Sequence, residues 1–105
     1  MTSLNQTFVA LADPTRRAIL DVLIKKGGQS ITQLRTVNED ITRQAFEKHV
    51  GVLISARVVI KRKKGRESMV KVAPSAFMDV ALWMKHYEKL WEHKLSKLGT
   101  YLDRD

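Results

Sequence analysis

The sequence predicts a small, mainly α-helical domain with one two-stranded β-ribbon placed before its last helix. In most of the chain, apolar residues recur at spacings of three and four, which is the period of an α-helix. Residues 58–72 differ, because β-branched residues lie on both sides of a central glycine, as is typical of a β-hairpin. With 105 residues, 44% of them hydrophobic, the chain can bury one modest core, so we expect a single domain over residues 1–105.

A short amphipathic helix is expected first, over residues 4–12. Its apolar residues fall at i, i+4, i+7 and i+8, and therefore share one side of a helix. They are Leu4, Phe8, Leu11 and Ala12. Asp13-Pro14 directly after them predicts a new helix, because the Asp side chain can cap it and Pro is well tolerated in its first turn.

The second helix is expected from Pro14 to about Lys26, where Gly27-Gly28 ends it. Arg16 and Arg17 near its start are expected on a solvated face, with a phosphate contact as the alternative. The residues of this helix expected in the core are Ile19, Leu20, Leu23 and Ile24.

Two helices joined by a tight turn are expected next. Ser30 and Gln33 have the spacing of a capping box, which starts the first of them. Asn38-Glu39-Asp40 interrupts the apolar pattern and predicts the turn, and Thr42 is a suitable N-cap for the second helix, residues 42–56. The buried residues are expected to be Ile31, Leu34 and Val37 in the first helix and Ala45, Phe46, His49, Val50, Leu53 and Ile54 in the second.

The other face of the 42–56 helix is polar. A helix with such a face fits the major groove of DNA, where Arg, Lys and Gln side chains bond base edges. The residues of this face, with the N-cap, are Thr42, Arg43, Gln44, Glu47, Lys48 and Gly51.

The ribbon of residues 58–72 is strongly basic. From Arg57 to Lys71, seven of fifteen residues are Lys or Arg, and Gly65 permits a tight turn at the tip. Beside a polar helix, such a hairpin would reach phosphates or the adjacent minor groove, whereas alone it could be an edge kept basic against aggregation. The helix pair and ribbon together predict a winged helix-turn-helix. The wing residues expected at DNA are Arg62, Lys63, Lys64 and Arg66.

The last helix is expected to run unbroken from about Ser75 to Tyr101. Its apolar stripe is longer than so small a body can cover, so we expect it to pack against the same helix of a second copy. A core helix within one chain is the alternative. The stripe consists of Phe77, Val80, Met84, Tyr87, Trp91, Leu95, Leu98 and Leu102, with Trp83 and Leu90 beside it.

Several stretches resemble the ArsR-type winged helix-turn-helix transcriptional regulators. Residues 11–20, LADPTRRAIL, resemble the start of that family's second helix, and residues 42–53, TRQAFEKHVGVL, resemble its recognition helix. Residues 56–59 and 62–67 resemble the exit from that helix and the wing. The resemblance implies a homodimeric repressor that binds an inverted repeat, with the helices of residues 4–12 and 75–102 at the dimer interface. The interface residues expected are Leu4, Phe8, Phe77, Val80, Met84, Tyr87, Trp91, Leu95 and Leu98.

The chain also departs from the family's metal-binding patterns. The metal-sensing branch has a Cys-x-Cys pair before the recognition helix, where residues 31–35 offer no ligand. Another branch has ligands on the last helix, where this chain has Asp79, His86 and His93. We expect solvated or interface side chains there, with a site shared across a dimer as the alternative. No metal and no other cofactor are therefore expected.

Two residues of the expected recognition helix also differ from the family. Glu47 stands where the family has a small hydroxyl residue; it would repel phosphate but could accept from a cytosine amino group. Gly51, where the family often has Lys, weakens a helix. Close approach of another backbone or of DNA is the only explanation that the sequence offers for it.

The charge balance indicates the partner. The chain has 19 Lys and Arg against 11 Asp and Glu, a formal charge of +8, which favours double-stranded DNA over an anionic membrane. It has no Cys, no long apolar run and no signal-peptide core, so a soluble, cytoplasmic protein is expected. The sequence contains neither a phosphate-binding loop nor a recognisable set of catalytic residues, so an enzyme is not expected. A small-molecule effector, and a protein-docking role in place of DNA binding, stay open.

Overall fold

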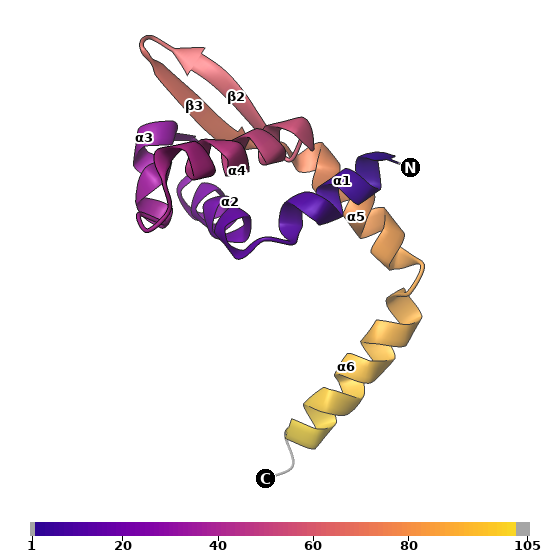
Figure 1. Ribbon diagram of the computed structural model, residues 1–105. Coiled ribbons are helices and arrows are strands. Elements are labelled where there is room, and N and C mark those ends of the chain that lie inside the picture. The colour runs from indigo at the N-terminus through magenta and orange to yellow at the C-terminus, as the bar shows by residue number, and fades with distance from the viewer. Residues whose placement is uncertain (1, 103–105) are drawn as a thin grey trace.

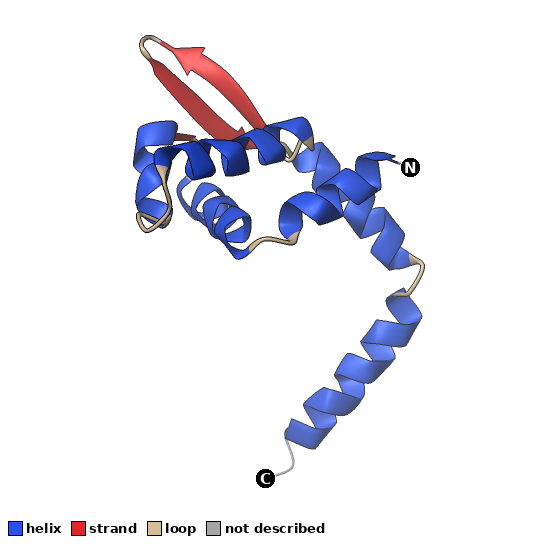
Figure 2. Cartoon of the chain, in the orientation of Figure 1, coloured by secondary structure: helices blue, strands red, loops and turns tan. Residues whose placement is uncertain are grey.

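The computed structural model describes residues 2–102, and its helices and strands follow the predicted order (Figure 1). The helices are α1 (Thr2–Leu11), α2 (Pro14–Lys26), α3 (Ile31–Leu34), the 3-10 turn η1 (Arg35–Val37), α4 (Arg43–Ser55), α5 (Pro74–Lys85) and α6 (Glu88–Leu102). The strands are β1 (Gln29–Ser30), β2 (Val59–Lys64) and β3 (Glu67–Val72). Figure 2 shows a mainly helical chain from which the β2–β3 hairpin stands out, so the predicted fold class is confirmed.

The core lies where α2, α3 and α4 meet the base of the sheet. Its largest fully buried side chains include Phe46, Ile19, Leu34, Leu53, Val58 and Val70. Most of the predicted core residues of α2 and α4 are confirmed, but Ile24 is 65% exposed and that prediction is wrong. Ile24 lies about 100° further around the helix than Leu23, which is 3% exposed, and this turns it away from the core.

The predicted helix caps are present. Asp13 accepts a hydrogen bond from the Arg16 amide at 3.0 Å, and Thr42 accepts one from the Ala45 amide at 3.0 Å. Ser30 and Gln33 form the reciprocal capping box, with bonds of 3.0 and 2.8 Å. Each helix of the helix-turn-helix therefore starts at a residue that satisfies free amides of its first turn.

The sheet has three strands in the order β1-β3-β2, so the prediction of a two-stranded ribbon was incomplete. Gln29 pairs with Val70 and Ser30 with Met69, on the edge of β3 that β2 leaves free. Gly27 adopts a φ of 78°, which lets the chain turn from α2 into β1. Because Ser30 also caps α3, this short strand joins the base of the wing directly to the helix-turn-helix.

The last helix is broken, which corrects the prediction of one continuous helix. His86 and Tyr87 bond back only three residues, to the carbonyls of Trp83 at 3.2 Å and Met84 at 2.9 Å, and α6 starts at Glu88 in a new direction. The Trp83 ring lies 5.5 Å from Phe8 of α1 and 5.3 Å from Tyr87. Packing of these rings against α1 accompanies the break.

Helix α6 extends away from the rest of the chain (Figure 1). The radius of gyration is 16.9 Å, whereas a compact domain of this length has about 13 Å. Within residues 2–102, no helix combines the length and the apolar character needed to span a membrane.

Candidate nucleic-acid interface

The outer face of α4 carries the side chains predicted to meet DNA. Phe46, Val50 and Leu53 turn into the core, and the residues on the opposite side are exposed. These exposed residues, with the N-cap, are Thr42, Arg43, Gln44, Glu47 and Lys48. A polar helix face held on a packed core is what major-groove recognition requires.

Two of these side chains contact each other. The Arg43 Nε donates to Glu47 Oε1 at 3.1 Å, one helical turn apart, with the side chains 83% and 52% exposed. Such an exposed pair stabilises a helix by only about 0.3–0.5 kcal/mol. Its effect on stability is therefore small, and its main consequence is that it restricts where the Arg43 guanidinium lies.

Gly51 lies on the same helix without close neighbours. A Cβ built on it would meet nothing within 4 Å, so no other part of the described chain approaches it closely. The explanation by a close approach of this chain's own backbone is therefore wrong.

The turn between α3 and α4 is fastened by Arg35. Its guanidinium donates to the carbonyl of Asn38 at 2.7 Å and to that of Ile41, and it lies 5.5 Å from the centre of the Phe46 ring. Asn38 in turn donates to the Thr15 hydroxyl of α2 at 3.2 Å. These contacts fix the angle between the two helices.

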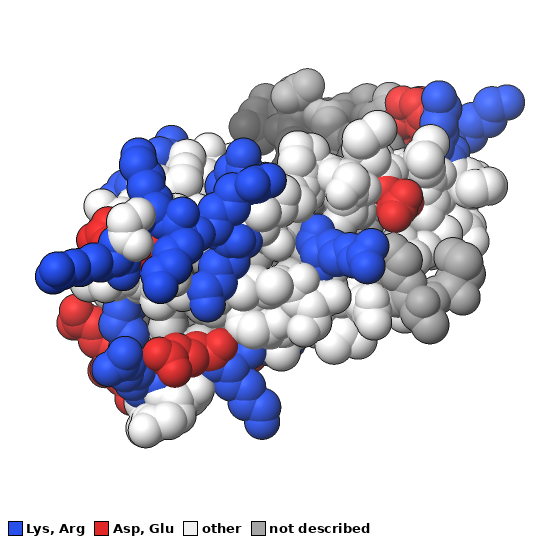
Figure 3. Space-filling view, turned by 90° about the horizontal axis from the view of Figure 1, so that it is seen from above, with Lys and Arg blue, Asp and Glu red and all other residues white. Residues whose placement is uncertain are grey.

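The wing is a cationic hairpin whose base is joined to α4. The Val58 amide donates to the Leu53 carbonyl at 3.0 Å, and the Ala73 amide donates to the Val58 carbonyl at 2.8 Å. Along β2, Lys61 and Lys63 alternate with Arg62 and Lys64 on the two faces of the hairpin. All four are exposed, as is Arg66 after the tip residue Gly65, whose φ is 63°. Seen from above, Lys and Arg side chains gather over the wing (Figure 3).

An unexpected polar network joins α1, α2 and α4. Arg16 donates through Nε to the Ala10 carbonyl at 2.8 Å and through Nη2 to the Val9 carbonyl at 2.9 Å. Its Nη1 lies 3.0 Å from His49 Nδ1. Because Arg can only donate, His49 Nδ1 is the acceptor in this arrangement. The prediction that Arg16 lies on a solvated face, or contacts phosphate, is wrong.

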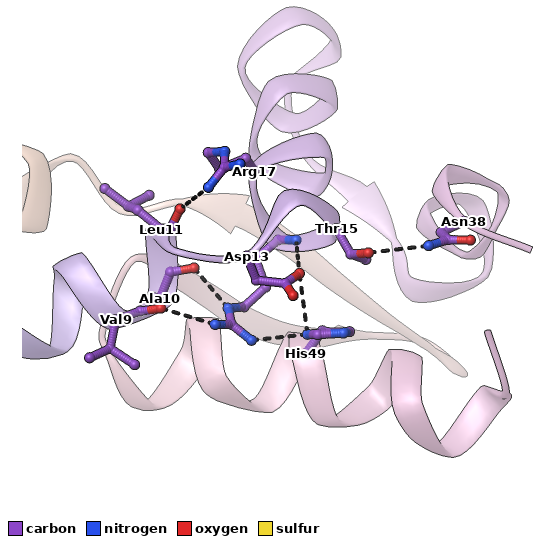
Figure 4. Close-up of polar contacts among 9 residues, drawn as sticks. Val9, Ala10, Leu11, Asp13, Thr15, Arg17, Asn38 and His49 are labelled. Carbon is purple, nitrogen blue, oxygen red and sulfur yellow. Dashed lines mark hydrogen bonds and ion pairs between the residues drawn. The ribbon is translucent and has the colours of Figure 1, made fainter. Parts of the chain in front are cut away.

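Asp13 completes this network. Figure 4 shows Asp13 and His49 facing each other, and Asp13 Oδ2 lies 3.7 Å from His49 Nδ1. Partial burial acts to raise the pKa of the Asp13 carboxyl, but the hydrogen bond from the Arg16 amide and the electrostatic interactions with the His49 ring and the Arg16 guanidinium outweigh it. The pKa of Asp13 therefore lies below its ordinary value. The one sequence signal for this network was a histidine in the otherwise apolar stripe of α4.

The residues expected at a dimer interface do not form one surface within the chain. Leu4, Phe77 and Val80 are half-buried between α1 and α5, and Phe8 joins Trp83 and Tyr87 at the edge of that pair. Met84 is exposed near the break, whereas Leu95 and Leu98 are exposed on α6 beyond it. The side chains of Trp91 and Leu102 lie outside what the structure describes.

The histidines of the last helices belong to no cluster of three possible metal ligands within the described residues. His86 Nδ1 lies 3.2 Å from the Trp83 carbonyl of its own turn. In the part of the chain that the structure describes, no three His, Asp or Glu side chains come close enough together to hold a metal ion.

The chain is similar to known transcriptional regulators along nearly its whole length. A family described as a helix-turn-helix domain matches residues 11–62. The transcriptional repressor SdpR of Bacillus subtilis is 30% identical over 84 residues, which cover 80% of this chain and 91% of SdpR. The crystal structure of the ArsR family transcriptional regulator RHA00566 superposes with a TM-score of 0.77 at 33% sequence identity. The aligned region covers 87% of this chain and 92% of the RHA00566 chain. The structure of an ArsR-like transcriptional regulator from Rhodococcus sp. RHA1 superposes with a TM-score of 0.71 at 27% sequence identity. The aligned region covers 99% of this chain and 96% of that regulator's chain.

Proposed function

This chain belongs to the ArsR family of DNA-binding winged helix-turn-helix transcriptional regulators, and from that premise we propose that it is a homodimeric repressor that reads an inverted repeat. The observation that carries the proposal is the joining of two surfaces by one rigid frame. The polar face of α4 and the cationic wing are linked through the Val58 bonds, and β1 ties the wing to α3. A frame of this kind can present both surfaces to one duplex at the same time.

The two surfaces have different roles in this proposal. Arg62, Lys63, Lys64 and Arg66 of the wing contact phosphates and supply affinity that does not depend on sequence. Arg43, Gln44 and Lys48 reach base edges in the major groove, and Thr42 caps the helix that carries them. All these side chains are exposed, which leaves them accessible for these contacts.

The dimer proposal is supported by apolar surface that the chain leaves uncovered. Leu90, Leu95 and Leu98 of α6 are 60%, 54% and 50% exposed, and Met84 and Tyr87 near its start are 43% and 49% exposed. Single exposed apolar residues are ordinary, but a helix that extends from the body with such residues along it needs a covering partner. A second copy of the same helices meets that need, and its two-fold axis matches an inverted repeat.

The role of repressor is proposed by analogy with SdpR, which is a transcriptional repressor. A dimer that covers its operator excludes other proteins from the same stretch of DNA. Repression then follows from where the operator lies relative to the promoter, and needs no further activity of the chain.

Two measurements test the proposal. Sedimentation gives the oligomeric state, and fluorescence anisotropy gives the affinity for duplexes from the region upstream of the coding sequence. Several phosphate contacts should weaken binding by orders of magnitude between about 50 and about 200 mM salt. A protein that sediments as one copy and binds no duplex even at low salt would refute both parts.

A further inference from the structure

We infer that Glu47 is a positioning residue, which holds the Arg43 guanidinium so that Arg43 reads a guanine in the major groove. The inference rests on the proposed function, because it assigns a role within the same DNA-binding face. It replaces the expectation that Glu47 itself contacts a base.

The geometry of the pair leaves the reading end of Arg43 available. An arginine has five N–H donors, one on Nε and four on the two terminal nitrogens. Glu47 Oε1 takes the Nε donor at 3.1 Å. The terminal nitrogens keep the donors that form the two-bond contact with O6 and N7 of guanine. A single carboxylate therefore favours one orientation of the side chain without using the donors that read the base.

The charge of Glu47 explains why a carboxylate can lie on a face that meets DNA. Alone it would repel the phosphates, but paired with Arg43 it makes a unit without net charge. Arg43 is 83% exposed even beside Glu47, so without that contact its side chain would be free to change rotamer, and a phosphate would attract it as strongly as a base. The pair weakens attraction to any phosphate and leaves guanine as the preferred partner.

A second arginine nearby, Arg35, makes contacts within the folded chain. Arg35 and Arg43 both line a hollow of about 300 Å³ between α3 and α4, which Thr32 and Glu47 also border. The Arg35 guanidinium is held by the carbonyls of Asn38 and Ile41 and by the Phe46 ring. Of the two arginines at this hollow, Arg43 is therefore the one whose guanidinium can reach DNA.

The test measures discrimination between bases in addition to affinity. The operator is first mapped with single base-pair changes, and the guanine position whose penalty disappears in R43A is the one assigned to Arg43. In the wild type, replacing that guanine should weaken binding by about 5- to 150-fold. In E47A we expect this penalty to fall by at least about threefold, because the pair is stronger where the interface excludes water than it is in free solution.

The salt dependence gives a second readout. In E47A, Arg43 is free to engage a phosphate, so the slope of log affinity against log salt should steepen by about 0.9 and affinity for unrelated duplexes should rise. E47Q keeps the acceptor oxygen without the charge, so it should retain more of the guanine penalty than E47A does. Glu39→Ala removes one exposed carboxylate from the preceding turn, and should leave the guanine penalty unchanged.

The double variant separates positioning from direct contact. If Glu47 acts through Arg43, adding E47A to R43A changes no base preference, whereas direct reading of cytosine by Glu47 would leave an effect of E47A in the R43A background. That persistence, or a full guanine penalty in E47A, would overturn the inference. Failure of the wild type to prefer any operator over unrelated DNA would instead overturn the proposed function. Equal thermal midpoints of wild type and E47A would exclude loss of folding as the cause.

Discussion

At the scale of single residues, the network of Asp13, Arg16 and His49 links the proposed DNA helix to the proposed dimer helix. Arg16 bonds two carbonyls near the end of α1, and its third contact is His49 on the inner side of α4. Asp13 starts α2 and lies against the same histidine. Charged groups that are partly withdrawn from water are stable only when their bonds are complete, so these three side chains set how α1 and α4 meet.

The lowered pKa of Asp13 predicts a loss of stability in acid. Because the folded-state pKa lies below the unfolded one, the contribution is fully present above the ordinary Asp value of about 3.9, and is lost as the pH falls through the folded pKa. D13N keeps a good N-cap and removes the charge. We expect wild type to be more stable than D13N near pH 7, as measured by urea unfolding, and this difference to disappear in acid. An equal difference at both pH values would contradict the assignment, and Asp21→Asn on the same helix is the control.

At the scale of elements, the helices with strong local signals were predictable, and the features created by tertiary pairing were not. Asp13, Ser30 and Thr42 start their helices where their cap chemistry predicts. Strand β1 is two residues long and exists only because β3 offers a free edge, which no local pattern of Gln29 and Ser30 encodes.

Dependence on tertiary contacts also explains why the break in the last helix and the contacts of Arg16 were not predicted. No glycine or proline marks the break in the last helix at residues 86–87. The break instead accompanies the packing of Trp83 between Phe8 and Tyr87, of which Phe8 is far away in the sequence. The role of Arg16 depends on carbonyls of α1 that only the folded chain places beside it. The outer face of α4 and the wing were predicted correctly as exposed surfaces, since alternation along a strand and the helical period indicate which side chains face away from the core.

The wing and α4 should differ in what they contribute to binding. The Arg62→Ala, Lys64→Ala double variant removes two cations from one face of the hairpin, so it should weaken all duplexes alike and make the salt slope shallower by about two. Gln44→Ala should instead relax the preference at one base pair. Anisotropy titrations at several salt concentrations distinguish the two effects. The control variant Lys89→Ala, Lys94→Ala removes the same charge from α6, and the opposite pattern of effects would show that the roles are exchanged.

At the scale of the whole molecule, the chain has a well-packed body and an extension that it does not cover. Among the residues that the structure describes, α6 packs extensively against no other helix or strand, whereas α1 and α5 lie against each other. The core of the body is complete without α6, since the buried apolar side chains among the described residues all precede residue 77. Folding of one copy and assembly of two should therefore depend on different residues.

That separation predicts the outcome of charging α6. The Leu95→Glu, Leu98→Glu double variant puts carboxylates where each copy would bury leucine, at a cost of about 3 kcal/mol or more for the dimer, so its dissociation constant should rise at least about 100-fold. The thermal midpoint of the body should change little in the monomer. Operator affinity should fall with dimerisation, because one copy reaches only one half-site.

The position of the charge matters as much as its presence. His93→Glu with Lys89→Glu changes at least as much charge on the opposite side of the same helix, and should leave a dimer in sedimentation experiments. If the leucine variant also stays dimeric and keeps full operator affinity, α6 is not the contact between copies, and α1 and α5 alone must provide it. If both variants dissociate equally, net charge rather than the apolar stripe controls assembly.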